Sequence, residues 1–149
     1  MKAIYNIYYK PFEALSPYEL YDAIKLRNEV FVVEQNCIFQ DADGKDLDAF
    51  HLFIYQEEKL LAYSRLIAAG LGYKEMSIGR IVSSPAARGM GIGRVLVAES
   101  IKACKQLFGE GPIRIGAQYY LLNFYRSFGF KEEGDIYLED GIEHIEMVL

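Results

Sequence analysis

The fold is decided by one stretch of the sequence, Ile78-Gly79-Arg80-Ile81-Val82-Ser83-Ser84-Pro85-Ala86-Ala87-Arg88-Gly89-Met90-Gly91-Ile92-Gly93-Arg94-Val95-Leu96. Residues 78–82 are apolar and β-branched enough for a buried strand, which Pro85 ends. Three alternating glycines follow, and after Gly93 apolar residues recur at helical spacing. Such a loop turns several backbone N–H groups toward one point at the positive end of a helix. The stretch therefore predicts a strand, a phosphate-binding loop and a helix.

The spacing of the loop distinguishes between kinds of phosphate site. A Walker loop ends in Gly-Lys-Ser/Thr, whereas Gly93 is followed by Arg94. The dinucleotide fingerprint is G-x-G-x-x-G with an acidic residue closing the next strand, but here the spacing is G-x-G-x-G and that strand ends in Gln118. A glycine-rich turn without a ligand is the structural alternative. Arg88 in front of three glycines at a helix start favours a binding site.

The pattern Arg88-x-x-Gly91-x-Gly93 resembles the pyrophosphate loop of the Gcn5-related N-acetyltransferases, the GNAT superfamily, which bind acetyl-coenzyme A (acetyl-CoA). The resemblance implies acetyl-CoA as cosubstrate. In many relatives an asparagine also contacts the coenzyme; Gln118 stands at that place and retains an amide, one carbon longer. The expected coenzyme-binding residues are Ile81, Val82, Ser83, Arg88, Gly89, Met90, Gly91, Ile92, Gly93, Arg94 and Gln118.

Composition sets limits on the class of protein. The chain has 149 residues, 52% of them apolar and 25% charged, which is typical of one soluble globular domain over residues 1–149. The net charge of −5 argues against non-specific nucleic-acid binding. Two cysteines without metal-like spacing indicate a reducing cytoplasm, no disulfide framework and no metal site. Neither a signal peptide nor a membrane-spanning run is evident, so no membrane partner is expected.

Local signals predict an α/β protein with the element order β-α-β-β-β-α-β-α-β-β. Ser16, Pro17 and Glu19 form a helix start with a capping box. The expected strands are 3–9, 51–56, 60–67, 75–82, 113–117, 137–138 and 142–149, and the expected helices are 16 to about 34, 93–108 and 119–128. This order resembles the GNAT acyl-CoA N-acyltransferase fold over the whole chain. The resemblance implies a mixed central sheet with helices on both faces, and two splayed strands that hold the coenzyme arm.

A second group of residues surrounds Tyr125. In the GNAT superfamily a tyrosine on a short helix precedes a Gly-Phe pair and gives a proton to the leaving thiolate, and Tyr125 holds that position before Gly129-Phe130. A packing role beside Phe128 is the structural alternative. Four further blocks resemble the ElaA-like subfamily: Arg27 to Gln35, Gly79 to Val82, Ala117-Gln118 and Glu139 to His144.

The sequence leaves the general base open. Where some relatives carry a catalytic glutamate, this chain has Ser77. Candidate bases are Glu34, His51, Glu75 and His144, although the alternation around His144 favours a structural strand histidine. Arg65 is expected to have a charged partner or face a cleft because it lies within a strand. The tentative acceptor-side residues are Glu34, His51, Arg65 and His144. Aspartates 41, 43, 46 and 48 are not an EF-hand, because the closing glutamate and the flanking helix pair are missing.

These observations together predict an N-acetyltransferase that moves the acetyl group of acetyl-CoA to a primary amine of a small molecule or peptide. The amine attacks the thioester directly in a ternary complex. Two alternatives remain: an acyl-homoserine-lactone-type acyltransferase, which shares the fold, and a non-catalytic CoA-binding regulatory protein. A homodimer is a further open expectation, and the acceptor stays unidentified.

Overall fold

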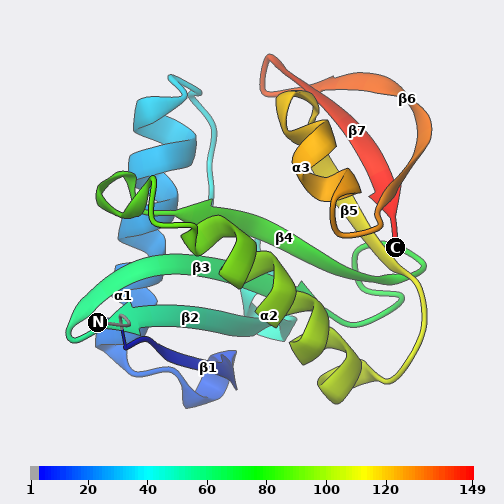
Figure 1. The fold of residues 1–149 in the computed structure, drawn as a ribbon. Coiled ribbons are helices and arrows are strands. Elements are labelled where there is room, and N and C mark those ends of the chain that lie inside the picture. Colours follow the sequence, from blue (N-terminus) through cyan, green and yellow to red (C-terminus); the bar gives the residue numbers. More distant parts are fainter. Residues whose placement is uncertain (1–3) are drawn as a thin grey trace.

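The computed structural model describes residues 4–149, which form a mixed seven-stranded sheet flanked by helices (Figure 1). The strand order is β1-β2-β3-β4-β5-β7-β6, and every neighbouring pair is antiparallel except β4 and β5, which are parallel. The strands are β1 (Asn6–Pro11), β2 (Phe50–Gln56), β3 (Lys59–Ile67), β4 (Met76–Ser83), β5 (Ile113–Gln118), β6 (Lys131–Glu139) and β7 (Ile142–Val148). The predicted element order and the mixed sheet are confirmed.

The helices cover both faces of the sheet, as predicted. They are α1 (Pro17–Arg27), α2 (Ile92–Phe108) and α3 (Leu122–Arg126), and short 3-10 turns occur at Phe12–Ala14, Lys45–Asp48, Pro85–Ala87 and Tyr119–Leu121. Helix α1 packs with Phe53, Tyr63 and Val82 in one cluster of buried side chains. Helices α2 and α3 pack in a second cluster on the opposite face, where Leu96 is 1% exposed. Burying a leucine of this kind contributes about 1.5–3 kcal/mol.

The predicted helix start at Ser16 and the predicted turn at Asp140-Gly141 are both confirmed by the structure. The Ser16 hydroxyl accepts from the backbone N–H of Glu19, whose carboxylate in turn accepts from the N–H of Ser16. This is the predicted capping box, and Pro17 occupies the first helical position. At the far end of the chain, Asp140 and Gly141 have φ angles of 51° and 80°. Two consecutive positive angles make the tight hairpin that this pair predicts.

Two boundaries differ from the sequence-based expectation. The first helix does not run as one α-helix to residue 34, because it becomes π-helical at Asn28–Glu34. Its backbone bonds there span five residues, as from the N–H of Gln35 to the carbonyl of Val30. Strand β6 begins at Lys131 rather than at Tyr137. The first half of this strand is exposed and polar, so the sequence shows no apolar alternation there, and backbone pairing with β7 holds it as a strand. The expected first strand began at Ala3, which lies outside the described residues.

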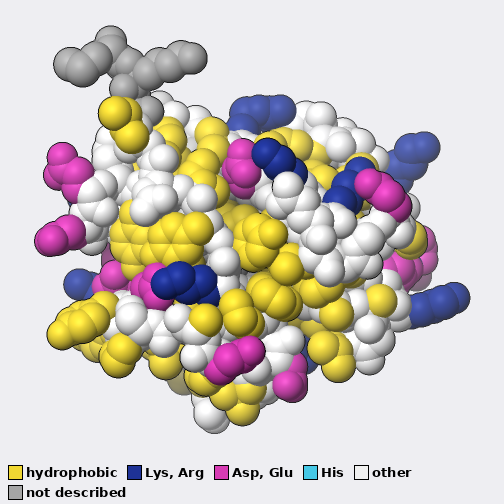
Figure 2. Space-filling model, turned by 90° about the horizontal axis from the view of Figure 1, so that it is seen from below, with side chains coloured by type: hydrophobic (Ala, Val, Ile, Leu, Met, Phe, Trp, Pro, Cys, Tyr) yellow, Lys and Arg dark blue, Asp and Glu magenta, His cyan; other side chains and the backbone are white. Residues whose placement is uncertain are grey.

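The surface of the molecule mixes apolar and charged side chains. Seen from below, hydrophobic side chains gather in the middle of the face, while charged side chains of both signs surround them (Figure 2). Within residues 4–149, none of the helices combines the length and the apolar character that spanning a membrane requires. The homodimer stays a prediction, which the molecular mass in solution will test.

Candidate active site

The site is a cleft between β4 and β5. These two strands share only the pairs Met76 with Ile113 and Ser77 with Arg114, and then diverge. A cleft of about 540 Å³ opens beyond the last pair. Its walls come from β4 and β5, the π-helical segment, the start of α2, α3 and the turn between β6 and β7. The expected splaying of the strands on either side of the glycine loop is therefore present.

Strand β4 bulges where it forms one wall of the cleft. Its register with β3 moves from Arg65 opposite Gly79 to Tyr63 opposite Val82, so two residues of β4 face one residue of β3. Arg80, inside the bulge, has a φ of 46°, which costs a non-glycine residue on the order of 1–3 kcal/mol. Its guanidinium Nε donates to Asp41 at 3.0 Å, and this ion pair helps to offset the strain. A bulge takes backbone groups out of the ladder, here beside the cleft.

The glycine loop leads directly into α2. Gly89 and Gly91 have φ angles of 83° and 73°, a region that favours glycine, and α2 begins at Ile92. The first N–H groups of this 17-residue helix have no partner within the helix. Of the expected coenzyme-binding residues, those that line the cleft are Ile81, Val82, Ser83, Arg88, Gly93 and Gln118.

The remaining members of that set lie beside the cleft rather than in its wall: Gly89, Met90, Gly91, Ile92 and Arg94. The Ile92 side chain is buried in the core. The Arg94 guanidinium donates to the hydroxyl of Ser127 at 3.1 Å and lies over the ring of Phe128. Ile92 thus has only its backbone to offer a ligand, and the Arg94 side chain is already engaged elsewhere.

Arg88 and Glu34 form an ion pair at the loop end of the cleft. The two guanidinium nitrogens of Arg88 donate to the two carboxylate oxygens of Glu34 at 2.7 and 2.5 Å. The hydrogen bonds from Arg88 hold the pKa of Glu34 below its usual value. Both side chains line the cleft, so the pair ties the π-helical segment to the glycine loop. The sequence suggested Glu34 for the acceptor side and Arg88 for the coenzyme, but it did not predict that the two side chains meet at the loop end.

Tyr125 lies on α3 and lines the cleft. It is 5% exposed and packs edge-on against the rings of Phe124 and Phe130. Burial raises the pKa of its phenol, so the phenol stays protonated at neutral pH. No residue in the described range 4–149 is a hydrogen-bond partner of its hydroxyl. The group is therefore a free O–H donor beside the cleft.

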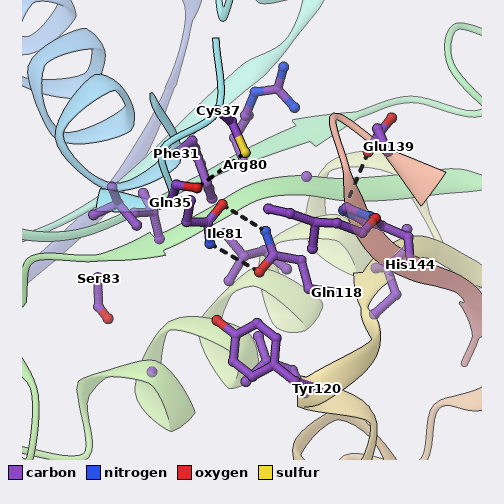
Figure 3. A pocket seen from close by; sticks show the side chains of 18 of the residues that line it. Phe31, Gln35, Cys37, Arg80, Ile81, Ser83, Gln118, Tyr120, Glu139 and His144 are labelled. Carbon is purple, nitrogen blue, oxygen red and sulfur yellow. Dashed lines mark hydrogen bonds and ion pairs between the residues drawn. The ribbon is translucent and has the colours of Figure 1, made fainter. Parts of the chain in front are cut away.

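A pair of amide side chains spans the middle of the cleft (Figure 3). Gln35 and Gln118 exchange two hydrogen bonds of 3.1 Å, each Nε2 donating to the other Oε1. Nearby, the thiol of Cys37 lies 3.3 Å from the carbonyl oxygen of Asp140. We call the pair Gln35 and Gln118 the amide bridge. Because the amide bridge and the contact of Cys37 with Asp140 join segments on opposite sides of the cleft, they divide the cleft into a loop end and a far end.

The far end of the cleft contains His144 and Glu139. His144 is 6% exposed, and its Nδ1 lies 2.8 Å from the backbone carbonyl of Ile142. Its Nε2 lies 3.4 Å from a carboxylate oxygen of Glu139, whose side chain is 59% exposed. Figure 3 places both residues on the opposite side of the amide bridge from Ser83. His144 is thus in the wall of the cleft, as the acceptor-side prediction requires.

Two other acceptor-side candidates lie elsewhere. His51 is 1% exposed, between the hydroxyl of Tyr63 at 2.6 Å and the carbonyl of Asp46 at 2.9 Å. Arg65 is 4% exposed and donates twice to Asp43, at 2.8 and 2.9 Å. Neither side chain lines the cleft, because each is held inside a polar network on the other side of β4. The structure therefore corrects their assignment, although it confirms the expected partner of Arg65.

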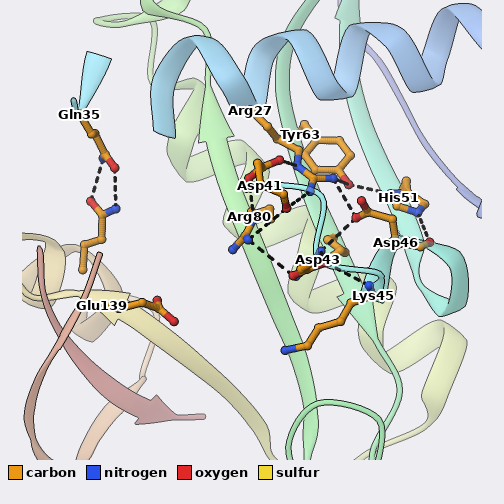
Figure 4. A network of polar contacts seen from close by, with 12 residues as sticks. Arg27, Gln35, Asp41, Asp43, Lys45, Asp46, His51, Tyr63, Arg80 and Glu139 are labelled. Carbon is orange, nitrogen blue, oxygen red and sulfur yellow. Dashed lines mark hydrogen bonds and ion pairs between the residues drawn. The ribbon is translucent and has the colours of Figure 1, made fainter. Parts of the chain in front are cut away.

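That network joins the acidic loop to three arginines from three different elements (Figure 4). Arg27 donates to Asp41 at 2.7 Å and to Asp46 at 2.8 Å. Burial opposes the ionisation of Asp43, but hydrogen bonds from Arg65 outweigh burial and lower its pKa to about 2. The members of the ion network are Arg27, Asp41, Asp43, Asp46, Arg65 and Arg80.

The network also explains three aspartates of the acidic loop, because Asp41, Asp43 and Asp46 all pair with arginines. No group of three or more His, Cys, Asp or Glu side chains suited to a metal ion occurs within residues 4–149.

Glu75, the remaining candidate base, accepts from Arg114 at 3.0 and 2.8 Å and does not line the cleft. The sequence offered no signal for Gln35 or Glu139 beyond the subfamily blocks that contain them.

Comparison with known proteins shows what the chain is similar to. The model of the acetyltransferase (GNAT) domain matches residues 22–149. Protein ElaA of Escherichia coli K12 is 42% identical over 89% of this chain and 88% of its own length, and its crystal structure superimposes with a TM-score of 0.90 over 97% of this chain. An acyl-CoA N-acyltransferase from Pseudomonas aeruginosa is 40% identical, with a TM-score of 0.93 over 97% of this chain and 99% of that one.

A more distant structure is also similar in fold. It is a Bacillus subtilis acetyltransferase in complex with CoA, 18% identical, with a TM-score of 0.69 over 98% of each chain.

Proposed function

Because the chain belongs to the GNAT acetyltransferase family and is a relative of ElaA, we propose that it transfers the acetyl group of acetyl-CoA to a primary amine of a small molecule or peptide. The whole chain acts as one acetyltransferase domain in this proposal. The observation that carries it is the wedge between β4 and β5 beside a glycine loop that opens α2. Such a wedge fits a ligand with a diphosphate and an extended amide arm such as CoA, and a Bacillus subtilis acetyltransferase of similar fold was solved in complex with CoA.

Residues at the loop end suit the diphosphate. The unpartnered N–H groups at the start of α2 and the loop glycines form a cradle for an anion at the positive end of a helix. Arg88 adds a planar guanidinium that can bond two phosphate oxygens. Ile81, Val82 and Ser83 line the wedge, and their backbone amides suit the amide arm, while Gln118 lies on the facing strand β5.

Residues in the middle of the cleft suit the acyl transfer. Acetyl-CoA supplies a thioester, and holding an amine beside it accounts for much of the rate. The backbone of the bulge in β4 offers N–H groups that can polarise a carbonyl. Tyr125 offers its phenolic proton to a leaving thiolate.

The Glu34–Arg88 pair leads to a prediction about coenzyme affinity. Because Glu34 occupies the guanidinium that the diphosphate needs, Glu34→Gln should tighten the binding of acetyl-CoA about two- to fivefold, the scale of an exposed ion pair. Isothermal titration at low and at physiological salt measures this change. Glu58→Gln, an exposed carboxylate in the turn between β2 and β3, is the control that should leave affinity unchanged. Unchanged or weaker binding in Glu34→Gln would contradict the competition.

The proposed function is tested by binding and turnover measured on the same protein. Acetyl-CoA should raise the melting temperature, and a panel of primary amines should produce free thiol in its presence. Binding without thiol release from any amine would favour a CoA-binding regulator. Preference for a long acyl-CoA with homoserine lactone as product would favour the lactone-type acyltransferase.

A further inference from the structure

The far end of the cleft suggests which group takes the proton of the acceptor. We infer that His144 accepts the proton that the amine loses when it attacks, with Glu139 as the outlet to solvent. The inference rests on the proposed function and adds the base, which the sequence left open. It follows from the tautomer of His144, its surroundings and its place in the cleft.

The hydrogen bond at Nδ1 fixes the tautomer of His144. A backbone carbonyl only accepts, so the contact of Nδ1 with the carbonyl of Ile142 at 2.8 Å requires a proton on Nδ1. In the neutral imidazole Nε2 then carries a lone pair. This is the nitrogen that lies next to Glu139, where no other hydrogen-bond partner is present in residues 4–149. The neutral ring of His144 therefore presents a basic nitrogen, and the carboxylate of Glu139 beside it stabilises the imidazolium that forms when Nε2 takes a proton.

The surroundings of His144 hold the ring in place and connect it to solvent. The ring of Tyr137 on β6 stacks on the imidazole with the centroids 5.7 Å apart, and Gln118 of the amide bridge is its cross-strand neighbour on β5. The side chain of Glu139 is half exposed, with its carboxylate 3.4 Å from Nε2. A proton taken by Nε2 can thus pass to Glu139 and leave through water.

The position of His144 also fits an acceptor that enters from the far end. The amide bridge separates this end from the glycine loop (Figure 3). Glu139 and Asp140 line the far end, so their negative charges favour a cationic acceptor there. A primary alkylamine is an ammonium ion at neutral pH and must lose a proton before it attacks. The far end both attracts that ion and offers it a base.

The acetyl transfer needs two proton transfers, and His144 and Tyr125 supply the groups for both. The ammonium loses one proton to Nε2 of His144, and the free amine nitrogen bonds to the thioester carbonyl carbon. The carbon–sulfur bond breaks, and the leaving sulfur takes the proton of Tyr125. The second proton lost by nitrogen restores the phenol, directly or through water. The products are the amide, the free thiol and one proton released through Glu139.

The test compares His144→Asn with the wild-type protein. Asparagine can keep a donor for the carbonyl of Ile142 but removes the basic nitrogen. With acetyl-CoA and a panel of monoamines, diamines and lysine peptides as probes, kcat should fall about a hundredfold at pH 7. The Kd for acetyl-CoA should stay the same. Glu143→Gln, on the exposed side of the same strand, is the matched control and should keep full activity.

The pH profile separates a proton acceptor from a structural residue. In His144→Asn the rate should rise about tenfold per pH unit toward the pKa of the amine, because free amine then arrives from solution. The wild-type profile should be flatter. Equal kcat in wild type and variant, or a parallel loss at all pH values, overturns the inference while the proposed function stands. A wild-type protein that acetylates no amine overturns both.

Discussion

Replacing Tyr125 with phenylalanine is expected to lower kcat for acetyl transfer about a hundredfold while leaving the Kd for acetyl-CoA nearly unchanged. The substitution removes one oxygen from a residue that lines the cleft and keeps the ring that packs against Phe124 and Phe130. Since no hydrogen bond of the hydroxyl is lost within the described chain, folding stability should change little. The measurement is steady-state thiol release, with calorimetric titration of the coenzyme alongside.

The matched control for this experiment is Tyr119→Phe. Tyr119 lies in the 3-10 turn just before α3 and does not line the cleft, so its hydroxyl should not matter for turnover. Equal activity of wild type and Tyr125→Phe would remove Tyr125 from the proposed mechanism. Loss of coenzyme binding in Tyr125→Phe would instead assign the residue a structural role.

Replacing Arg27 with alanine is expected to lower the free energy of unfolding by about 3–5 kcal/mol, the cost of removing one partner from a buried ion pair. The Arg27 side chain is 1% exposed and bonds to Asp41 and Asp46. Without it, the buried carboxylate of Asp41 and the partly buried carboxylate of Asp46 lose their nearest counter-charge. For a chain of this length the melting temperature should fall by about 10 °C. Urea denaturation measures the free energy directly.

The control for Arg27 is an arginine in an exposed pair. Arg126 bonds to Glu132 on the surface, so Arg126→Ala should change stability little. A melting temperature for Arg27→Ala as high as that of Arg126→Ala would show that the ion network contributes little. Because the bulge at Arg80 lies beside the cleft and Arg80 bonds to Asp41, weaker coenzyme binding in Arg27→Ala than in Arg126→Ala would show that the network also supports the bulge.

Signals that act over a few residues were sufficient to predict most of the fold. Ser16 and Glu19 define a helix start by themselves, and Asp140 with Gly141 defines a tight turn. The loop from Arg88 to Gly93 identified the family, because few other sites need an arginine and alternating glycines before a helix. The splayed strands followed from the family resemblance rather than from any residue of β4 or β5.

Contacts between distant residues could not be predicted in the same way. Gln35 meets Gln118 only because the π-helical segment and the end of β5 face each other across the cleft. His51 was a candidate base because the sequence around a single histidine in a strand does not reveal whether its side chain faces the cleft or a polar network elsewhere. The exposed first half of β6 has no apolar alternation, and only its pairing with β7 makes it a strand.

The ion network also has a consequence for the order of folding. Its arginines come from α1, β3 and β4, so Asp41, Asp43 and Asp46 are neutralised only after these elements have assembled. Until then the like charges repel one another and keep this segment extended. We therefore expect the loop to dock after the rate-limiting barrier, so that substitutions in it speed unfolding and leave the refolding rate almost unaltered.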